Sequence, residues 1–176
     1  RPFTYTHAPP AGRPRSNIAV EPHRVAIRDL RPSAGTASLD REGFAVAHGA
    51  SALRDFDDEE AIREIYYPES ARILQAATGA ARVHIFDHTT RRRVPEPEQQ
   101  VDSPRQPVQR VHIDHTARSG PQRVRDLLPD EAEVLLKGRV QVINLWRPIR
   151  GPVQDAPLAV CDATTIRAAD LVPSDL

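Results

Sequence analysis

The alternation of apolar and polar residues predicts short β-strands along much of the chain. In the segment 83–86, Val83 and Ile85 fall on one face and His84 and Phe86 on the other, which is the period-two pattern of a strand. The same alternation, or a short apolar run, occurs in residues 17–31, 44–48, 111–114, 139–148 and 157–163. The segment 139–148 (RVQVINLWRP) is the strongest of these, because it is rich in β-branched and aromatic residues and ends at a proline.

A period of three to four residues predicts helices in two regions. In the first, Asp57 or Asp58 is the expected N-cap, and acidic residues follow in the first turn, where the helix dipole favours them. Pro68 is expected to interrupt this helix, and a second helix over 69–77 should end at Gly79. Residues 121–128 and 129–138 are expected to form one or two further short helices. Strands outnumber helices, so the sequence predicts an α+β, mainly β class.

The length of 176 residues predicts a single domain. Residues 1–17 contain four prolines and no periodicity, so we expect an extended N-terminal arm followed by the domain proper at 18–176. Residues 91–110 also contain four prolines without an apolar period. They are expected to form a mobile loop, which is either a lid over an active site or a plain connection.

Charge and composition narrow the classes of partner. The 24 basic and 24 acidic side chains cancel, so no net field favours nucleic acid or an anionic membrane. The single cysteine, Cys161, excludes a disulfide framework. The sequence also has no run of about 18 apolar residues, the length that a bilayer-spanning helix needs. These features predict a cytoplasmic protein. The chain has no methionine and closes without a strand or helix pattern, so a fragment of a longer polypeptide is one interpretation.

The motif His112-Ile113-Asp114 is the sharpest indication of chemistry. Residues i and i+2 of a strand project from the same face, with their Cα atoms about 7 Å apart. An imidazole and a carboxylate at this spacing suit two ligands of one metal ion. Two histidines and one carboxylate on one face of an octahedron are typical of non-haem Fe(II) oxygenases.

Other residues give weaker indications. His115 falls on the opposite face from the motif, and His84 and His88 are about 13 Å apart along a strand, too far to share an ion. Cys161 lies in an apolar segment, where an inert thiol is expected. Arg147 ends the strongest strand, and either a structural ion pair or an anion site would satisfy its guanidinium. The nucleophile-elbow, P-loop and dinucleotide-binding motifs do not occur.

Several segments, taken in order, resemble the CmcJ-like and aspergillic-acid-hydroxylase-like oxidoreductases, a branch near the gibberellin desaturases. They are YYPES…TGAARVHIFDHTTR, VHIDHT, GRVQVINLWRPIRGPVQDAPLAVCDATT and AADLV. The resemblance covers residues 40–172, and its most specific part runs from NLWRP to PLAVCD. This family is similar to the Fe(II)/2-oxoglutarate oxygenases of microbial secondary metabolism. The resemblance implies a double-stranded β-helix (jelly-roll, cupin-like) core with flanking helices, of which the second half is missing from this sequence.

The same resemblance implies a site. The family's H-x-D falls on His112 and Asp114 as two of three Fe(II) ligands, with 2-oxoglutarate as co-substrate and O₂ as oxidant. Asn144 and Arg147, from the family's Asn-x-Trp-Arg motif, are expected to contact the cofactor. A third histidine ligand and an arginine for the far carboxylate of 2-oxoglutarate are also implied. The only histidine after Asp114 is its neighbour His115.

The sequence therefore predicts an Fe(II)/2-oxoglutarate-dependent dioxygenase that hydroxylates or desaturates a small natural product. Two alternatives stay open. One is a non-catalytic binding or partner protein on a degenerate β-helix. The other is a zinc-dependent hydrolase or isomerase that uses the same H-x-D, since one histidine and one carboxylate do not select the metal.

Overall fold

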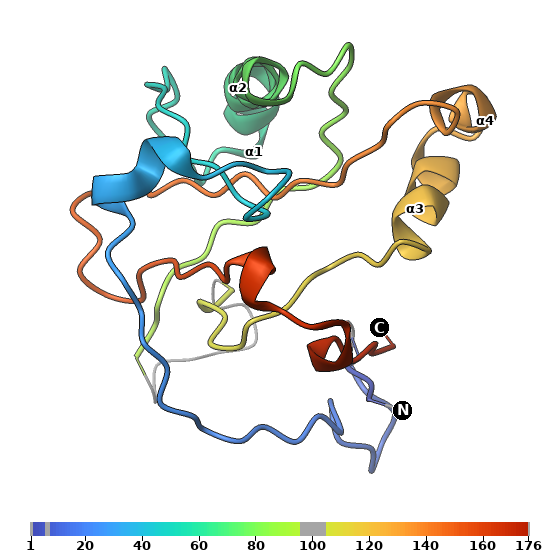
Figure 1. Ribbon diagram of the computed structural model, residues 1–176. Helices are drawn as coiled ribbons and strands as arrows, with labels where there is room; N and C mark the ends of the chain where they lie inside the picture. The colour runs from blue at the N-terminus through green and yellow to red at the C-terminus, as the bar shows by residue number, and fades with distance from the viewer. Residues whose placement is uncertain (1, 6–7, 96–104, 176) are drawn as a thin grey trace.

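The computed structural model describes residues 2–5, 8–95 and 105–175, and its helices form two separate groups (Figure 1). The first is one rod made of α1 (Glu59–Ala61), the π-helix η2 (Ile62–Tyr66) and α2 (Tyr67–Thr78). The second consists of α3 (Ser119–Leu127) and α4 (Ala132–Leu135). Three short 3₁₀ helices stand apart from both groups: η1 (Arg31–Thr36), η3 (Ala163–Thr165) and η4 (Ala168–Asp170).

Both ends of the helical rod follow from local sequence. The Oδ1 atom of Asp58 accepts hydrogen bonds from the backbone N–H groups of Glu60 and Ala61, each at 3.0 Å. At the other end, Gly79 adopts φ of 68° and donates its N–H to the carbonyl of Gln75 at 2.8 Å. A left-handed residue at this position favours glycine. The predicted N-cap and C-terminal glycine are both confirmed.

Pro68 does not break the rod, so the expected interruption is wrong. Proline lacks an N–H and would remove one i→i−4 hydrogen bond from a helix interior. Here the rod widens immediately before it, because the N–H of Tyr67 donates to the carbonyl of Ile62, five residues back. Pro68 consequently lies in the first turn of α2, where its missing N–H needs no intrahelical partner.

The second helical group lies where one or two short helices were expected, and the structure has two, with shifted boundaries. α3 begins two residues before the predicted 121–128, and α4 covers only four residues of the predicted 129–138. Arg125 of α3 donates its Nε–H to Glu133 of α4 at 2.8 Å, which ties the two helices together. Gly138 donates its N–H to Leu135 at 3.1 Å just after α4 ends.

The expected strands do not pair in the described residues, so a mainly β class is not confirmed. The described part of the chain contains three isolated bridges and no longer ladder: Phe3–Asp175, Thr4–Ser16 and Arg91–Arg105. A strand is stabilised by a neighbour about 4.8 Å away that satisfies its backbone groups. Alternation along the sequence marks the two faces of a strand and does not identify that neighbour. The predicted segments therefore run as irregular chain (Figure 1).

The buried core is small. The chain exposes 14,599 Å², whereas a folded monomer of this size exposes roughly 8,500 Å². Among the described residues the buried hydrophobic side chains are Leu53, Ile62 and Ala132. Apolar residues of the predicted strands stay in solvent, including Val111 at 77% and Ile113 at 67% exposure. The core therefore sits around the helical groups and leaves the predicted strand faces uncovered.

The two ends of the chain lie together (Figure 1). Thr4 donates its N–H to the carbonyl of Asp175, and Asp175 donates its own N–H to Pro2, both at 2.9 Å. Tyr5 also bonds back to Arg15 at 2.8 Å. The division into an arm and a domain stays a prediction, and residues 96–104 of the expected loop lie outside the described residues. No described helix has the length and apolar character needed to cross a bilayer.

Candidate metal centre

His112 and Asp114 lie side by side. His112 Nε2 is 3.6 Å from Asp114 Oδ1, and the two side chains are 41% and 46% exposed. Two donor atoms that each lie about 2.1 Å from one ion, in neighbouring positions, are themselves roughly 3–4 Å apart. The pair therefore fits two coordination positions of a single metal ion.

The backbone determines which nitrogen of His112 faces the carboxylate. Its Nδ1 lies 2.8 Å from the carbonyl oxygen of Arg110. A carbonyl only accepts, so Nδ1 carries the proton, and in the neutral ring the Nε2 lone pair faces Asp114. Two electron-rich atoms this close repel each other unless a cation, a metal ion or a proton, lies between them. Metal-binding histidines commonly donate their second nitrogen to a carbonyl in this way.

Asn144 reaches the pair from a segment thirty residues further along the chain. Its Nδ2 donates a hydrogen bond of 2.6 Å to Asp114 Oδ2. The two carboxylate oxygens therefore have different surroundings, since Oδ1 faces His112 and Oδ2 is occupied by the amide. The structure thus brings three of the four expected site residues together.

Arg147, the fourth expected site residue, contacts the helical rod. Its Nε donates to the hydroxyl of Tyr66 at 3.2 Å, and its guanidinium carbon lies 5.7 Å from the centre of that ring. Tyr66 in turn meets Phe56 edge to face at 5.3 Å. Across the described residues, no hydrogen bond or ion pair joins Arg147 to the metal-site pair. The guanidinium of Arg147 is therefore held by a phenol and an aromatic face, a typical cation–π partner, and its charge adds to the hydrogen bond from Ser51 in lowering the pKa of the Glu69 carboxylate.

The pair supplies two donors. No group of three His, Cys, Asp or Glu side chains able to hold an ion is formed by the residues that the structure describes. His115, the neighbouring histidine, has its Nδ1 3.5 Å from the hydroxyl of Ser119. A two-histidine, one-carboxylate site would require one more imidazole beside His112 and Asp114.

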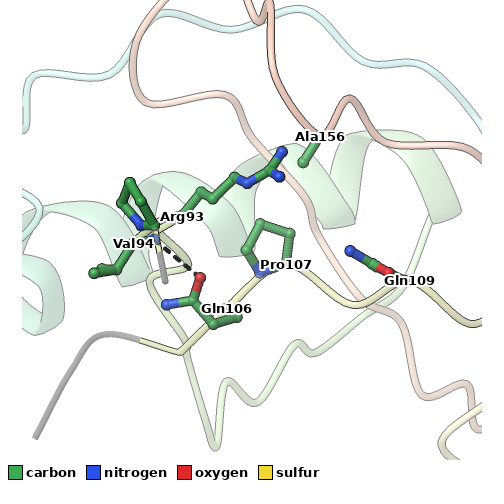
Figure 2. A pocket seen from close by; sticks show the side chains of 7 residues that line it. Arg93, Val94, Gln106, Pro107, Gln109 and Ala156 are labelled. Atoms are coloured by element: carbon green, nitrogen blue, oxygen red, sulfur yellow. Dashed lines mark hydrogen bonds between the residues drawn. The ribbon is translucent and has the colours of Figure 1, made fainter. Parts of the chain in front are cut away.

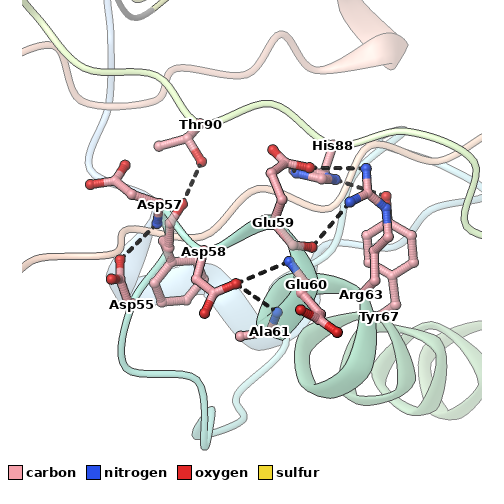
Figure 3. Close-up of polar contacts among 11 residues, drawn as sticks. Asp55, Asp57, Asp58, Glu59, Glu60, Ala61, Arg63, Tyr67, His88 and Thr90 are labelled. Atoms are coloured by element: carbon pink, nitrogen blue, oxygen red, sulfur yellow. Dashed lines mark hydrogen bonds and ion pairs between the residues drawn. The ribbon is translucent and has the colours of Figure 1, made fainter.

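A second polar cluster lies at the start of the helical rod (Figure 3). His88 Nε2 is 3.1 Å from Glu59 Oε1, and its Nδ1 is 2.8 Å from the hydroxyl of Tyr67. Arg63 holds the other oxygen of Glu59 at 2.9 Å. Because a carboxylate only accepts, Nε2 carries a proton, and in the neutral ring Nδ1 accepts from the phenol. Burial of the Tyr67 hydroxyl raises the pKa of that group above its ordinary value.

A cavity of about 300 Å³ opens beside this cluster. It is lined by side chains of both charges together with hydroxyl groups: Phe56, Asp57, Glu59, His88, Thr89, Thr90, Arg92 and Arg105. Arg92 is neutralised by Asp57 at 2.8 Å. Two carboxylates, Asp57 and Glu59, and two arginines, Arg92 and Arg105, line the same cavity, so its charges select neither an anion nor a metal cation.

A further cavity of about 340 Å³ lies beside Arg93, Val94 and Gln106 (Figure 2). Arg93 is paired there with Asp155 at 2.5 Å, and Gln106 Oε1 accepts the backbone N–H of Val94 at 3.0 Å. Neither of these two cavities is lined by the metal-site pair.

The partners of His88 could not be found from the sequence. Glu59 and Tyr67 lie 29 and 21 residues away from it, and the alternation around His88 indicates only a polar residue on a strand face. No local spacing connects the three side chains. The His112–Asp114 pair, in contrast, lies within three consecutive residues, which is why spacing alone could single it out.

Comparisons with known proteins agree on one class of relative. The chain is 42% identical to "Oxidoreductase AN1597" of Emericella nidulans over 88% of its own length and 52% of that protein. It is 33% identical to "Hydroxylase/desaturase poxK" of Penicillium oxalicum over 93% of the chain and 51% of that protein. It is also 32% identical to "Fe(II)/2-oxoglutarate-dependent dioxygenase nvfI" of Aspergillus novofumigatus, over 96% of the chain and 61% of that protein. The chain thus spans about half the length of the curated relatives it matches.

The fold matches a solved structure from the same group. The chain superposes on the iron and alpha-ketoglutarate-dependent endoperoxidase NvfI with a TM-score of 0.62 at 24% identity. The match covers 77% of this chain and 50% of that one. This likeness shows a shared fold. Residues 1–176 also match the family described as the oxidoreductase/YMDC permease-like domain. The chain therefore belongs to the oxidoreductase/YMDC permease-like domain family.

Proposed function

We propose that the protein is an Fe(II)- and 2-oxoglutarate-dependent dioxygenase that hydroxylates or desaturates a small natural product. The observation that carries the proposal is the His112–Asp114 pair, whose donor atoms face each other at 3.6 Å. Two relatives, named as a hydroxylase/desaturase and as an Fe(II)/2-oxoglutarate-dependent dioxygenase, support the same class. O₂ is the second substrate of such enzymes.

In this proposal His112 Nε2 and Asp114 Oδ1 hold Fe(II). The bound ion together with 2-oxoglutarate supplies the oxidation of a substrate C–H bond by O₂. The chain's own contribution is to hold the ligand atoms in place. The carbonyl of Arg110 fixes the ring of His112, and Asn144 fixes the carboxylate. A contact between Arg147 and the co-substrate stays a prediction, because its guanidinium rests on Tyr66.

We also propose that the protein has the double-stranded β-helix core of the CmcJ-like and aspergillic-acid-hydroxylase-like branch. Two observations support this. The chain shares the fold of NvfI over 77% of its length. His112 and Asn144 also lie in segments whose apolar and polar residues alternate, a pattern that is typical of strands. The domain over residues 18–176, preceded by the arm at 1–17, belongs to the same proposal.

The proposal is tested by turnover of 2-oxoglutarate in the gene-encoded protein. We expect succinate to form when Fe(II), 2-oxoglutarate and O₂ are present together, and His112→Ala and Asp114→Ala to abolish it. His84→Ala is the matched control, since His84 is an exposed histidine with no hydrogen bond or ion pair in the described part of the chain. Succinate formation that survives both ligand substitutions would overturn the assignment.

The purified metal separates the proposal from a zinc enzyme. The protein prepared without added metal should take up Fe(II) and produce succinate. A protein that retains zinc and forms no succinate after reconstitution with Fe(II) would instead support a hydrolase or isomerase. A protein that holds neither metal would support a binding protein.

A further inference from the structure

We propose that Asn144 is a positioning residue of the metal centre, which acts through Asp114 by turning one carboxylate oxygen toward the ion and occupying the other. The inference rests on the proposed function, since it describes how that site is built. Nothing in the local sequence links the two residues, which are thirty positions apart.

The hydrogen bond between them has one chemically possible direction. A carboxylate only accepts, so the amide must present its nitrogen, and the Nδ2–Oδ2 distance of 2.6 Å is that of a short, charge-assisted bond. The amide oxygen of Asn144 is thereby turned away from Asp114. Within the described part of the chain, this orientation of the amide is set by its hydrogen bond to Asp114.

The bond disfavours one of the two ways in which Asp114 could bind a metal. A free carboxylate can bind an ion through one oxygen or through both. Here Oδ2 is held by Asn144, while Oδ1 lies 3.6 Å from His112 Nε2. The hydrogen bond engages one lone pair of Oδ2 and therefore favours binding through Oδ1, the oxygen that faces the other ligand.

His112 is held in a matching way from the other side. Its Nδ1 is occupied by the carbonyl of Arg110, which leaves Nε2 for the ion. Each ligand thus has one atom tied to the protein and one atom facing the shared position. Outer contacts of this kind typically change metal affinity by about 10- to 100-fold when removed.

The test compares Asn144→Ala with Gln141→Ala in the gene-encoded protein. Gln141 is an exposed amide residue three positions earlier, and its side chain makes no hydrogen bond within the described residues. Fe(II) affinity is measured by anaerobic titration, and the visible band of the Fe(II)–2-oxoglutarate complex is recorded. Asn144→Ala should weaken Fe(II) binding by about 10- to 100-fold and shift the band, whereas Gln141→Ala should change neither.

A measurement without metal checks the contact itself. The side-chain NH₂ resonances of Asn144 in the metal-free protein, identified by their loss in Asn144→Ala, should move in Asp114→Ala and stay in place in Gln141→Ala. Thermal unfolding of each variant shows that it is folded. Asn144→Ser, which keeps a hydrogen-bond donor on a shorter side chain, should fall between the parent and Asn144→Ala in Fe(II) affinity.

The outcomes separate this inference from the proposed function. An Fe(II) affinity that is the same in the parent protein and in Asn144→Ala would overturn the positioning role and leave the dioxygenase assignment standing. Asn144 NH₂ resonances that keep their chemical shifts in Asp114→Ala would likewise overturn the positioning role alone. A parent protein that binds no Fe(II) would overturn both.

Discussion

His88 is held from both sides by side chains of the helical rod, and this arrangement sets the tautomer of its neutral ring. Glu59 accepts from its Nε2, and the phenol of Tyr67 donates to its Nδ1 in the neutral ring. The Tyr67 ring also meets the imidazole edge to face at 5.6 Å. Burial of the phenol raises its pKa, because the phenolate would lose solvation there.

The raised pKa of Tyr67 has a measurable consequence at alkaline pH. Since the folded state binds this proton more tightly than the unfolded chain, the resulting stabilisation is present below about pH 10. It is lost as the pH rises through the folded pKa. We expect ultraviolet titration to show one tyrosine ionising above the ordinary value, and Tyr67→Phe to remove that last step. An unchanged curve at the highest pH would contradict this.

The lowered pKa of Glu42 predicts that the protein loses stability as the pH falls into the acid range. The backbone N–H of Ser38 donates to its carboxylate at 2.8 Å, Arg41 pairs with it, and both lower its pKa. A lowered folded pKa stabilises the protein above the ordinary value of 4.5 and ceases to do so as the pH falls. Glu42→Gln should therefore lower the thermal midpoint at neutral pH, with a difference that shrinks toward pH 3. Glu64→Gln, at an exposed carboxylate, should show no such difference.

At the scale of elements, the helical rod contributes one of the buried apolar side chains of the described core. Ile62 at its π-turn is 3% exposed. We expect Ile62→Ala to lower the free energy of unfolding by roughly 2–5 kcal/mol, because it removes transfer free energy and leaves a cavity. Ile27→Ala is the control, since Ile27 is 75% exposed. Denaturant unfolding measures both, and equal effects would contradict a core at the rod.

The elements that sequence predicts well are those encoded locally. Asp58 and Gly79 each act within four residues, so the ends of the rod could be placed in advance. The π-turn before Pro68 could not, because proline alone predicts a break and the compensating bond runs from Tyr67 to Ile62. Strand pairing is non-local, and alternation in 139–148 does not specify a neighbour. The H-x-D pair was predictable for the same local reason, and its contact with Asn144 was not.

At the scale of the whole molecule, the exposed area sets an expectation for size in solution. A compact chain of this length has a radius of gyration of about 16 Å, and an unfolded one about 44 Å. With 14,599 Å² exposed, the 176-residue chain should lie clearly above the compact value and well below the unfolded one. Small-angle X-ray scattering measures this directly. A value of about 16 Å would show that the predicted strand faces are covered.

The uncovered faces also explain why the site is open. His112 and Asp114 belong to a segment whose apolar neighbours Val111 and Ile113 lie in solvent. In a paired sheet those residues would pack on one side and the ligand pair would project from the other. The two side chains of the pair are thus adjacent without a paired sheet around them among the described residues.

The most direct test of the account is whether His112 binds iron. The gene-encoded protein is mixed anaerobically with Fe(II) and then with 2-oxoglutarate, and the weak visible charge-transfer band of the chelate is recorded. We predict a band in the parent and in His84→Ala, and its loss in His112→Ala. A parent protein that shows no band, or a band that persists in His112→Ala, would contradict the assignment of the His112–Asp114 pair as an Fe(II) site.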